Sequence, residues 1–156
     1  MLNWFKKNKL PSRLRINRIE DYHTHYLGQT TDGTLFWGYE TFAFTKPPAE
    51  IKNEDWRKFR KEYAILHKFD KDGTYLNTKY WVCNDSFDPA MTSSKLEELA
   101  GELGEVEYKD IKIKLFQTTI DGVVFGLVPD EENETIELQP SSTISFQEPW
   151  DGEYET

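Results

Sequence analysis

The dipeptide Asp-Gly recurs between segments rich in aromatic and β-branched residues, and this pattern constrains the fold more than any other feature of the chain. It occurs at 32–33, 72–73, 121–122 and 151–152. The first three pairs each separate two strand-like runs, as with THYLGQT and TLFWGYETFAF. Because Asp-Gly readily adopts the positive φ angles of a tight turn, the sequence predicts three hairpins and a mainly antiparallel sheet.

The second pair lies in Asp70-Lys71-Asp72-Gly73, which also has the look of a calcium-binding loop. An EF-hand loop has its glycine at position 6 and oxygen ligands at positions 1 and 12. With Gly73 at position 6, Lys68 falls at position 1 and Lys79 at position 12. Two ammonium groups at these positions would repel calcium, so we predict a hairpin turn and no calcium site.

Two segments between the strand-like runs have features of helices. Residues 53–62, NEDWRKFRKE, begin with Asn53 as a candidate N-cap. Residues 93–104, SSKLEELAGELG, carry a Ser94–Glu97 capping box and have Gly104 where a helix would end. We therefore predict an α+β fold, in which a twisted antiparallel sheet of about six to eight strands, built from Asp-Gly hairpins, has one or two helices on one face.

Charge is distributed unevenly along the 156 residues, whose formal net charge is −9. The first 19 residues hold basic side chains and no acid, whereas no Lys or Arg follows Lys114. We expect residues 1–20 to form a basic N-terminal arm, at most partly ordered, and residues 21–156 to form a single domain.

The acidic balance of the chain disfavours nucleic acid as a partner, because phosphate binding depends on basic side chains. The basic N-terminal segment then either packs near the acidic C-terminal half or is simply solvated. The sharper hypothesis is that the acidic surface captures a protein partner with a basic surface.

Targeting and redox features favour a cytoplasmic protein. The N-terminus is charged but has no apolar signal-peptide core. The longest apolar run, VVFGLV at 123–128, is too short to cross a membrane. Cys83 is the single cysteine, so no internal disulfide can form.

The residues best suited to chemistry are Asp21, His23 and His25, in the stretch DYHTH. If this stretch is a strand, the three side chains project from one face, because side chains alternate with a period of 2. Two imidazoles and a carboxylate can bind zinc or iron, with His67 as a further candidate ligand. The alternative is that they are ordinary half-exposed residues of a strand. Since no catalytic motif is present, we expect no cofactor and no enzymatic activity, with a small metal-binding enzyme as the alternative.

The C-terminal stretch FQEPWDGEYET combines aromatic and acidic residues. One interpretation is that Trp150 docks on the body of the protein, since a single large ring can hold a chain terminus in place. The other is that Trp150, Asp151, Glu153 and Tyr154 form a protein-binding site with aromatic side chains at its centre and acids at its rim. We favour docking, and we take these four residues as the candidate binding site.

Several stretches together resemble a bacterial family of formate hydrogenlyase regulatory proteins. They are DYHTHYLGQTTDGTLFWGY, EYAILHKFDKDGTYLNTKYW, DIKIKLFQTTIDGVVFGLV and the ending FQEPWDGEYET, which cover most of the chain from Asp21 onward. The resemblance implies a cytoplasmic protein that restrains transcription of hydrogenase genes by binding a protein activator. It assigns no catalytic or ligand-binding residues.

The residues and the resemblance agree on a non-enzymatic regulatory protein that acts by binding another protein. A variant of this hypothesis is an immunity-type antagonist that neutralises a basic toxin. A further possibility is a homo-oligomer whose strand edges pair with each other.

Overall fold

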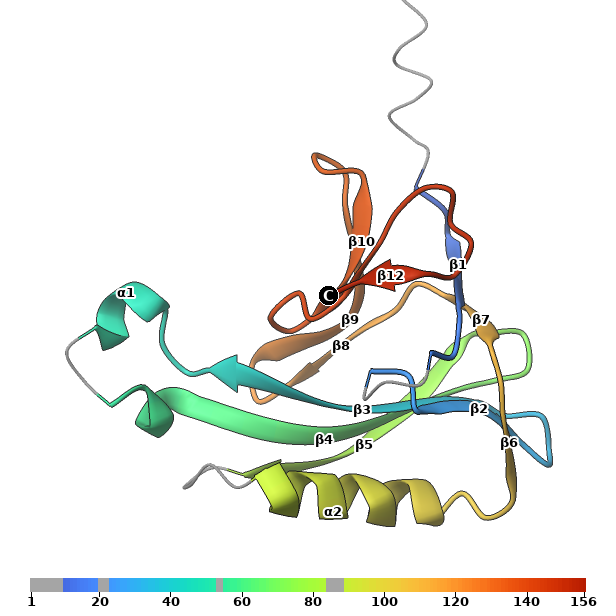
Figure 1. Ribbon diagram of the computed structural model, residues 1–156, viewed down its shortest axis with the longest axis horizontal. Helices are drawn as coiled ribbons and strands as arrows, with labels where there is room; N and C mark the ends of the chain where they lie inside the picture. The colour runs from blue at the N-terminus through green and yellow to red at the C-terminus, as the bar shows by residue number, and fades with distance from the viewer. Residues whose placement is uncertain (1–9, 20–22, 53–54, 84–88) are drawn as a thin grey trace, which may run out of the picture.

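The computed structural model describes residues 10–19, 23–52, 55–83 and 89–156, and strands dominate this part of the chain (Figure 1). Within these described residues, two α-helices and one 3-10 helix interrupt the strands. The strands are β1 (Arg13–Ile16), β2 (Tyr26–Thr30), β3 (Leu35–Phe44), β4 (Arg60–Phe69), β5 (Tyr75–Cys83), β6 (Val106–Tyr108), β7 (Ile111–Lys114), β8 (Gln117–Ile120), β9 (Val123–Asp130), β10 (Thr135–Gln139), β11 (Ser145–Phe146) and β12 (Tyr154–Glu155). The helices are α1 (Pro48–Ile51), the 3-10 helix η2 (Trp56–Phe59) and α2 (Pro89–Gly101).

The strands form three sheets in which the described neighbours are antiparallel. The main sheet has the order β5-β4-β3-β2-β6, the C-terminal sheet has the order β12-β11-β10-β9-β8, and a small sheet pairs β1 with β7. The predicted α+β class with antiparallel strands is confirmed, whereas the single sheet of about six to eight strands is wrong. The strands divide into separate sheets because a strand such as β10 buries side chains, here Ile136 and Leu138, on one face only. Two stacked sheets bury these apolar faces against each other.

The turn from β4 to β5 is held by hydrogen bonds of Asp70. In the turn from β4 to β5, the amide of Asp70 donates to the carbonyl of Thr74 over 2.8 Å. The carboxylate of Asp70 accepts from the amides of Asp72 and Thr74, each over 2.9 Å, and these bonds lower its pKa. The Asp70 side chain therefore closes its own turn, at the place where the sequence also suggested a calcium loop.

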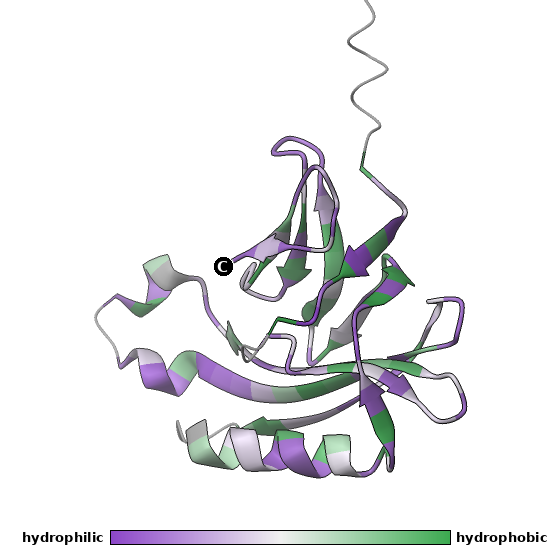
Figure 2. Ribbon diagram, turned by 45° about the vertical axis from the view of Figure 1, so that its right-hand side comes forward, coloured by the Kyte–Doolittle hydropathy of each residue, from purple (hydrophilic) through white to green (hydrophobic). Residues whose placement is uncertain are grey.

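The largest core lies between the main sheet and the C-terminal sheet. Trp37, Tyr39 and Tyr63 of the main sheet are fully buried there, and the Tyr63 ring contacts that of Phe125 in β9 with centroids 5.0 Å apart. Figure 2 shows hydrophobic and hydrophilic residues alternating along many of the strands, as expected when one face of each sheet is buried.

Helix α2 covers the opposite face of the main sheet (Figure 1). Its Leu96 is buried, and a Cβ built on Gly38 of β3 would lie only 3.3 Å from Leu96 Cδ1. Strand β3 is thus covered on both faces, which explains why its sequence is apolar on both sides.

The two predicted helix starts are wrong. Residues 55–59 hold only the single 3-10 turn η2 before β4 begins at Arg60, and Asp55 caps that turn by accepting from the amide of Arg57 over 3.1 Å. Asn53 lies outside the described residues. The long pairing of β4 with β3 overrides the local helical preference. Helix α2 begins at Pro89, so Ser94 lies inside it and does not cap it.

Part of the basic N-terminal segment belongs to the folded body. Strand β1 pairs with β7, where Leu14 lies opposite Ile113, and Leu14 and Ile16 are buried in the core. Residues 1–9 lie outside the described part. No helix of the described residues is long and apolar enough to cross a membrane.

Candidate functional site

The C-terminal hairpin formed by β11 and β12 docks on the body of the protein. Trp150 and Tyr154 are partly buried and pack against the main core. The Tyr154 hydroxyl lies 2.8 Å from Oγ1 of Thr24, and its ring contacts that of Phe146 edge-on at 5.6 Å. Two of the four predicted binding residues therefore anchor the hairpin, as the docking interpretation expects.

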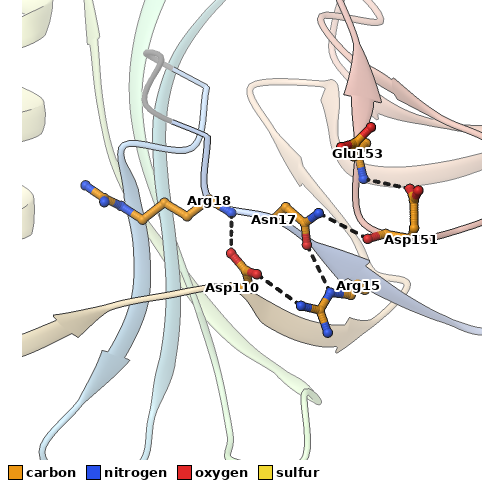
Figure 3. Close-up of polar contacts among 6 residues, drawn as sticks. All are labelled: Arg15, Asn17, Arg18, Asp110, Asp151 and Glu153. Atoms are coloured by element: carbon orange, nitrogen blue, oxygen red, sulfur yellow. Dashed lines mark hydrogen bonds and ion pairs between the residues drawn. The ribbon is translucent and has the colours of Figure 1, made fainter.

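Asn17, just after β1, holds the turn between β11 and β12 (Figure 3). Its amide donates to the carbonyl of Gly152 over 2.9 Å, and its Nδ2 donates to the carbonyl of Asp151 over 3.1 Å. Gly152 has φ +95°, and a Cβ at this position would lie 2.6 Å from Cγ of Asn17. Glycine is required here both for the backbone angle and for the close approach of Asn17.

Arg15, which is bonded to Asn17, pairs with an acid outside the C-terminal sheet. Arg15 donates from Nε to Oδ1 of Asn17 over 2.9 Å and forms its ion pair with Asp110, over 3.1 Å (Figure 3). The second oxygen of Asp110 accepts from the amide of Arg18 over 2.7 Å. The described end of the basic N-terminal segment thus packs next to the C-terminal turn, but the acidic partner of Arg15 is Asp110, which precedes Lys114 in the chain.

The carboxylates of the C-terminal sheet and its connections remain without cationic partners among the described residues. Of the ion pairs between residues that the structure describes, none involves a side chain after Asp110. Residues 117–155 contain no Lys or Arg. Two of their acidic residues, Asp130 and Glu137, are half-buried. The other acidic residues are exposed: Asp121, Glu131, Glu132, Glu134, Glu148, Asp151, Glu153 and Glu155. This part of the surface therefore carries an uncompensated negative field.

A hollow of about 150 Å³ lies within this surface. We call it the acidic hollow, and its lining residues are Ser145, Gln147, Glu148, Pro149, Asp151, Glu153, Tyr154 and Glu155. Cavities of about this volume hold ligands the size of benzene. The four carboxylates around it suit a cationic side chain.

Two carboxylates of the acidic hollow have defined partners within the hairpin. Asp151 accepts from the amide of Glu153 over 3.2 Å (Figure 3), and Glu155 accepts from the side-chain amide of Gln147 over 2.9 Å. Of the four predicted binding residues, Asp151, Glu153 and Tyr154 line the acidic hollow, whereas Trp150 packs against the core and does not line it.

The histidines of the DYHTH stretch do not lie on one face of a strand. Residues 23–25 form a turn, and strand β2 begins only at Tyr26, so the condition under which the three side chains would share a strand face is not met. His23 is buried and its carbonyl accepts from Nε1 of Trp37 over 2.8 Å, whereas His25 is exposed. Asp21 lies outside the described residues. Within the described chain, no group of three His, Cys, Asp or Glu side chains is placed to hold a metal ion.

His67 forms a buried polar network that the sequence did not reveal. The imidazole lies on the core face of β4, with Nε2 2.7 Å from the Tyr39 hydroxyl and Nδ1 2.7 Å from Oγ1 of Thr78. The Tyr75 hydroxyl lies 2.8 Å from the same Thr78 oxygen. Burial lowers the pKa of His67 to about 3, so the ring is neutral. The sequence did indicate that His67 is buried, because it lies two residues after the apolar Ile65 and so shares a strand face with it.

Comparison with known proteins found no matching family model, no matching curated protein and no matching solved structure. The function is therefore argued from the residues of this chain. Their main chemical feature is the set of carboxylates after Lys114 that have no cationic partner among the described residues, four of which line the acidic hollow.

Proposed function

We propose that this protein is a non-enzymatic regulatory protein that binds another protein, and that the C-terminal sheet with its acidic hollow receives a basic surface of that partner. The resemblance to formate hydrogenlyase regulatory proteins supports a regulatory role. In this proposal the protein acts in the cytoplasm, and the lone Cys83 is compatible with a reducing compartment.

The observation that carries the proposal is the absence of cationic partners for the described carboxylates of residues 117–155. Concentrated charge of one sign on one surface speeds the encounter with an oppositely charged protein and disfavours wrong partners. The docked hairpin adds a preformed shape, because Asn17 and Tyr154 already hold it in place. A rigid surface loses little conformational entropy on binding.

The same surface suits an antagonist of a basic toxin, the variant that also requires an acidic protein with a basic partner. Both forms bind through charge, and both predict that salt weakens binding. The identity of the partner separates them, since an activator of transcription and a secreted toxin are different classes of protein.

The experiment is affinity capture from native cytoplasmic extract with the tagged protein, at low and at high salt, followed by mass spectrometry. We expect one basic protein to be retained at low salt and lost at high salt. The captured protein is then purified, and its affinity is measured by titration calorimetry against the wild type and two matched variants.

The first variant neutralises Glu148 and Glu153 on the acidic hollow to Gln. The second neutralises Glu97 and Glu105, which are exposed within and just after α2, and so makes the same change in net charge elsewhere. We expect the first variant to bind several-fold more weakly and the second to bind nearly as well as the wild type. Equal losses in both variants, or binding that does not respond to salt, would overturn the assignment to this surface.

A further inference from the structure

The exposed face of the small sheet gathers basic side chains from two distant segments of the chain. Strands β1 and β7 lie side by side (Figure 1), and in both strands buried residues alternate with exposed ones. The register places Arg13 opposite Lys114 and Arg15 opposite Lys112. Because opposite residues of an antiparallel pair point to the same side, these four exposed side chains stand on one face. We call this face the basic ribbon.

The basic ribbon costs stability, so folding alone does not explain it. Like charges directly opposite each other destabilise a pair of strands, and the ribbon contains two such pairs. Uncharged polar side chains would cover the same face without this repulsion. Local features that work against the fold are expected at functional sites.

Ion pairs neutralise only one of the four cations. Arg15 pairs with Asp110 over 3.1 Å (Figure 3). Arg13, Lys112 and Lys114 form no ion pair within the described part of the chain. The ribbon therefore keeps three cations that no carboxylate of the described chain holds.

Two further acids, Asp70 and Asp72, belong to the turn from β4 to β5 beside the ribbon. Arg13 donates to the backbone carbonyl of Asp72, not to its carboxylate. The pKa of Asp70 is lowered first by its bond to the amide of Thr74. The charges of Lys114 and Arg13 lower it further. Since the hydrogen bonds of the Asp70 carboxylate go to amides of its own turn, the ribbon retains a positive field.

The chemistry of the basic ribbon suits phosphate groups better than a protein partner. Protein-binding sites have apolar or aromatic side chains at their centre, whereas the outward residues of β1 and β7 are Arg and Lys alone. These residues form a regular ladder, with Cβ atoms about 5 Å apart across the strands and about 7 Å apart along them. A sugar-phosphate backbone presents negative charge at regular intervals whatever its base sequence.

We propose that the basic ribbon binds the phosphate backbone of duplex DNA. A two-stranded β-ribbon is one of the elements that the major groove, about 12 Å wide, can admit. Contacts to phosphate position a protein on the duplex but read no bases, so the binding is independent of sequence. In the amino-acid sequence, Lys6, Lys7 and Lys9 precede β1, and no acid occurs before Glu20. Their charge adds to the attraction for phosphate.

The net charge of −9 disfavours nucleic acid only as an average over the whole chain. The pairing of β1 with β7 concentrates positive charge that composition does not reveal. The acidic C-terminal turn meets the ribbon at its Arg15 end, where Asn17 holds the turn. Repulsion from the acidic body weakens the attraction, so we expect micromolar affinity at low salt. The ribbon and the acidic hollow are different surfaces, and each proposal can therefore fail without the other.

The test is the fluorescence anisotropy of a short labelled DNA duplex, titrated with the full chain between about 50 and about 200 mM salt. Three unpaired cations predict a slope of about −2.7 for the logarithm of the binding constant against that of the salt concentration, which is about a fortyfold loss over this range. The ribbon variant combines Lys112→Gln with Lys114→Gln. It should bind about tenfold more weakly at low salt, with a slope of about −1.

The control variant replaces Lys52 and Lys58, which are exposed between β3 and β4, with Gln and so makes the same change in net charge. It should bind nearly as well as the wild type. The ribbon variant should melt at or above the wild-type temperature, because it removes like charges from opposite positions of a strand pair. A ribbon variant that melts below the wild type overturns the proposal, as do a wild type that leaves the duplex unbound at low salt and equal losses in both variants. Polyglutamate that competes as well as unlabelled duplex at equal charge concentration would assign the ribbon to an acidic protein instead.

Discussion

Acidification is expected to destabilise the protein through His67, a fully buried imidazole in β4. Both ring nitrogens are held by hydroxyls at 2.7 Å, and burial lowers the folded-state pKa from 6.5 to about 3. In the unfolded chain the imidazole has its ordinary pKa of about 6.5. The unfolded state therefore binds a proton more readily, so stability is full above pH 6.5 and is lost as the pH falls from about 6.5 toward 3.

The size of the effect follows from proton linkage. Between the two pKa values, each pH unit removes about 1.4 kcal/mol from the free energy of unfolding. His67 alone should therefore remove about 2 kcal/mol at pH 5 and about 3 kcal/mol at pH 4, relative to pH 8. Such a loss is a large share of the roughly 5–15 kcal/mol that stabilises a typical domain.

The assay is urea unfolding between pH 8 and pH 4 for the wild type and for His67→Gln. Glutamine can still bond to hydroxyl groups but does not titrate, so the variant isolates the contribution of the imidazole. Carboxylates titrate equally in both proteins and cancel in the difference; among them is Glu40, whose pKa is raised by burial. At pH 5 the wild type should have lost about 2 kcal/mol more than the variant. Parallel stability curves would refute the reasoning, because they would mean that a charged imidazole is tolerated in the fold.

Two further pairs of substitutions test the core and the docked hairpin. Tyr63→Phe should raise the free energy of unfolding by about 1 kcal/mol in thermal or urea unfolding, because the Tyr63 hydroxyl is buried without a hydrogen bond to the described residues. Tyr39→Phe should lower the free energy of unfolding by about 1–2 kcal/mol, because it removes the hydrogen-bond partner of Nε2 in the buried His67 ring. Opposite signs are the decisive result. Gly152→Ala should destabilise the protein by at least about 1 kcal/mol more than Gly122→Ala, since both glycines have positive φ but a Cβ meets Asn17 only at the first; equal losses would show that the turn is not held by this contact.

The local features of the fold were accessible from the sequence, and the pairing of distant segments was not. The apolar pattern of β4 and the turn-forming residues around Asp70 involve only a few neighbouring residues, so the sequence predicts the strand and the turn without knowledge of distant contacts. The small sheet instead depends on Leu14 meeting Ile113, about a hundred residues along the chain. The segment 53–62 illustrates the conflict, because its local helical signals are overridden by a ten-residue pairing with β3 that no local pattern reveals.

The candidate site was predictable to a similar extent. Composition alone located the negative charge after Lys114, and the C-terminal aromatic residues indicated docking. The role of Asn17 was hidden, because it belongs to a segment that the charge pattern assigned to a separate basic arm. His67 was hidden for a different reason: a histidine on a buried face cannot be told from a ligand until its hydroxyl partners are known.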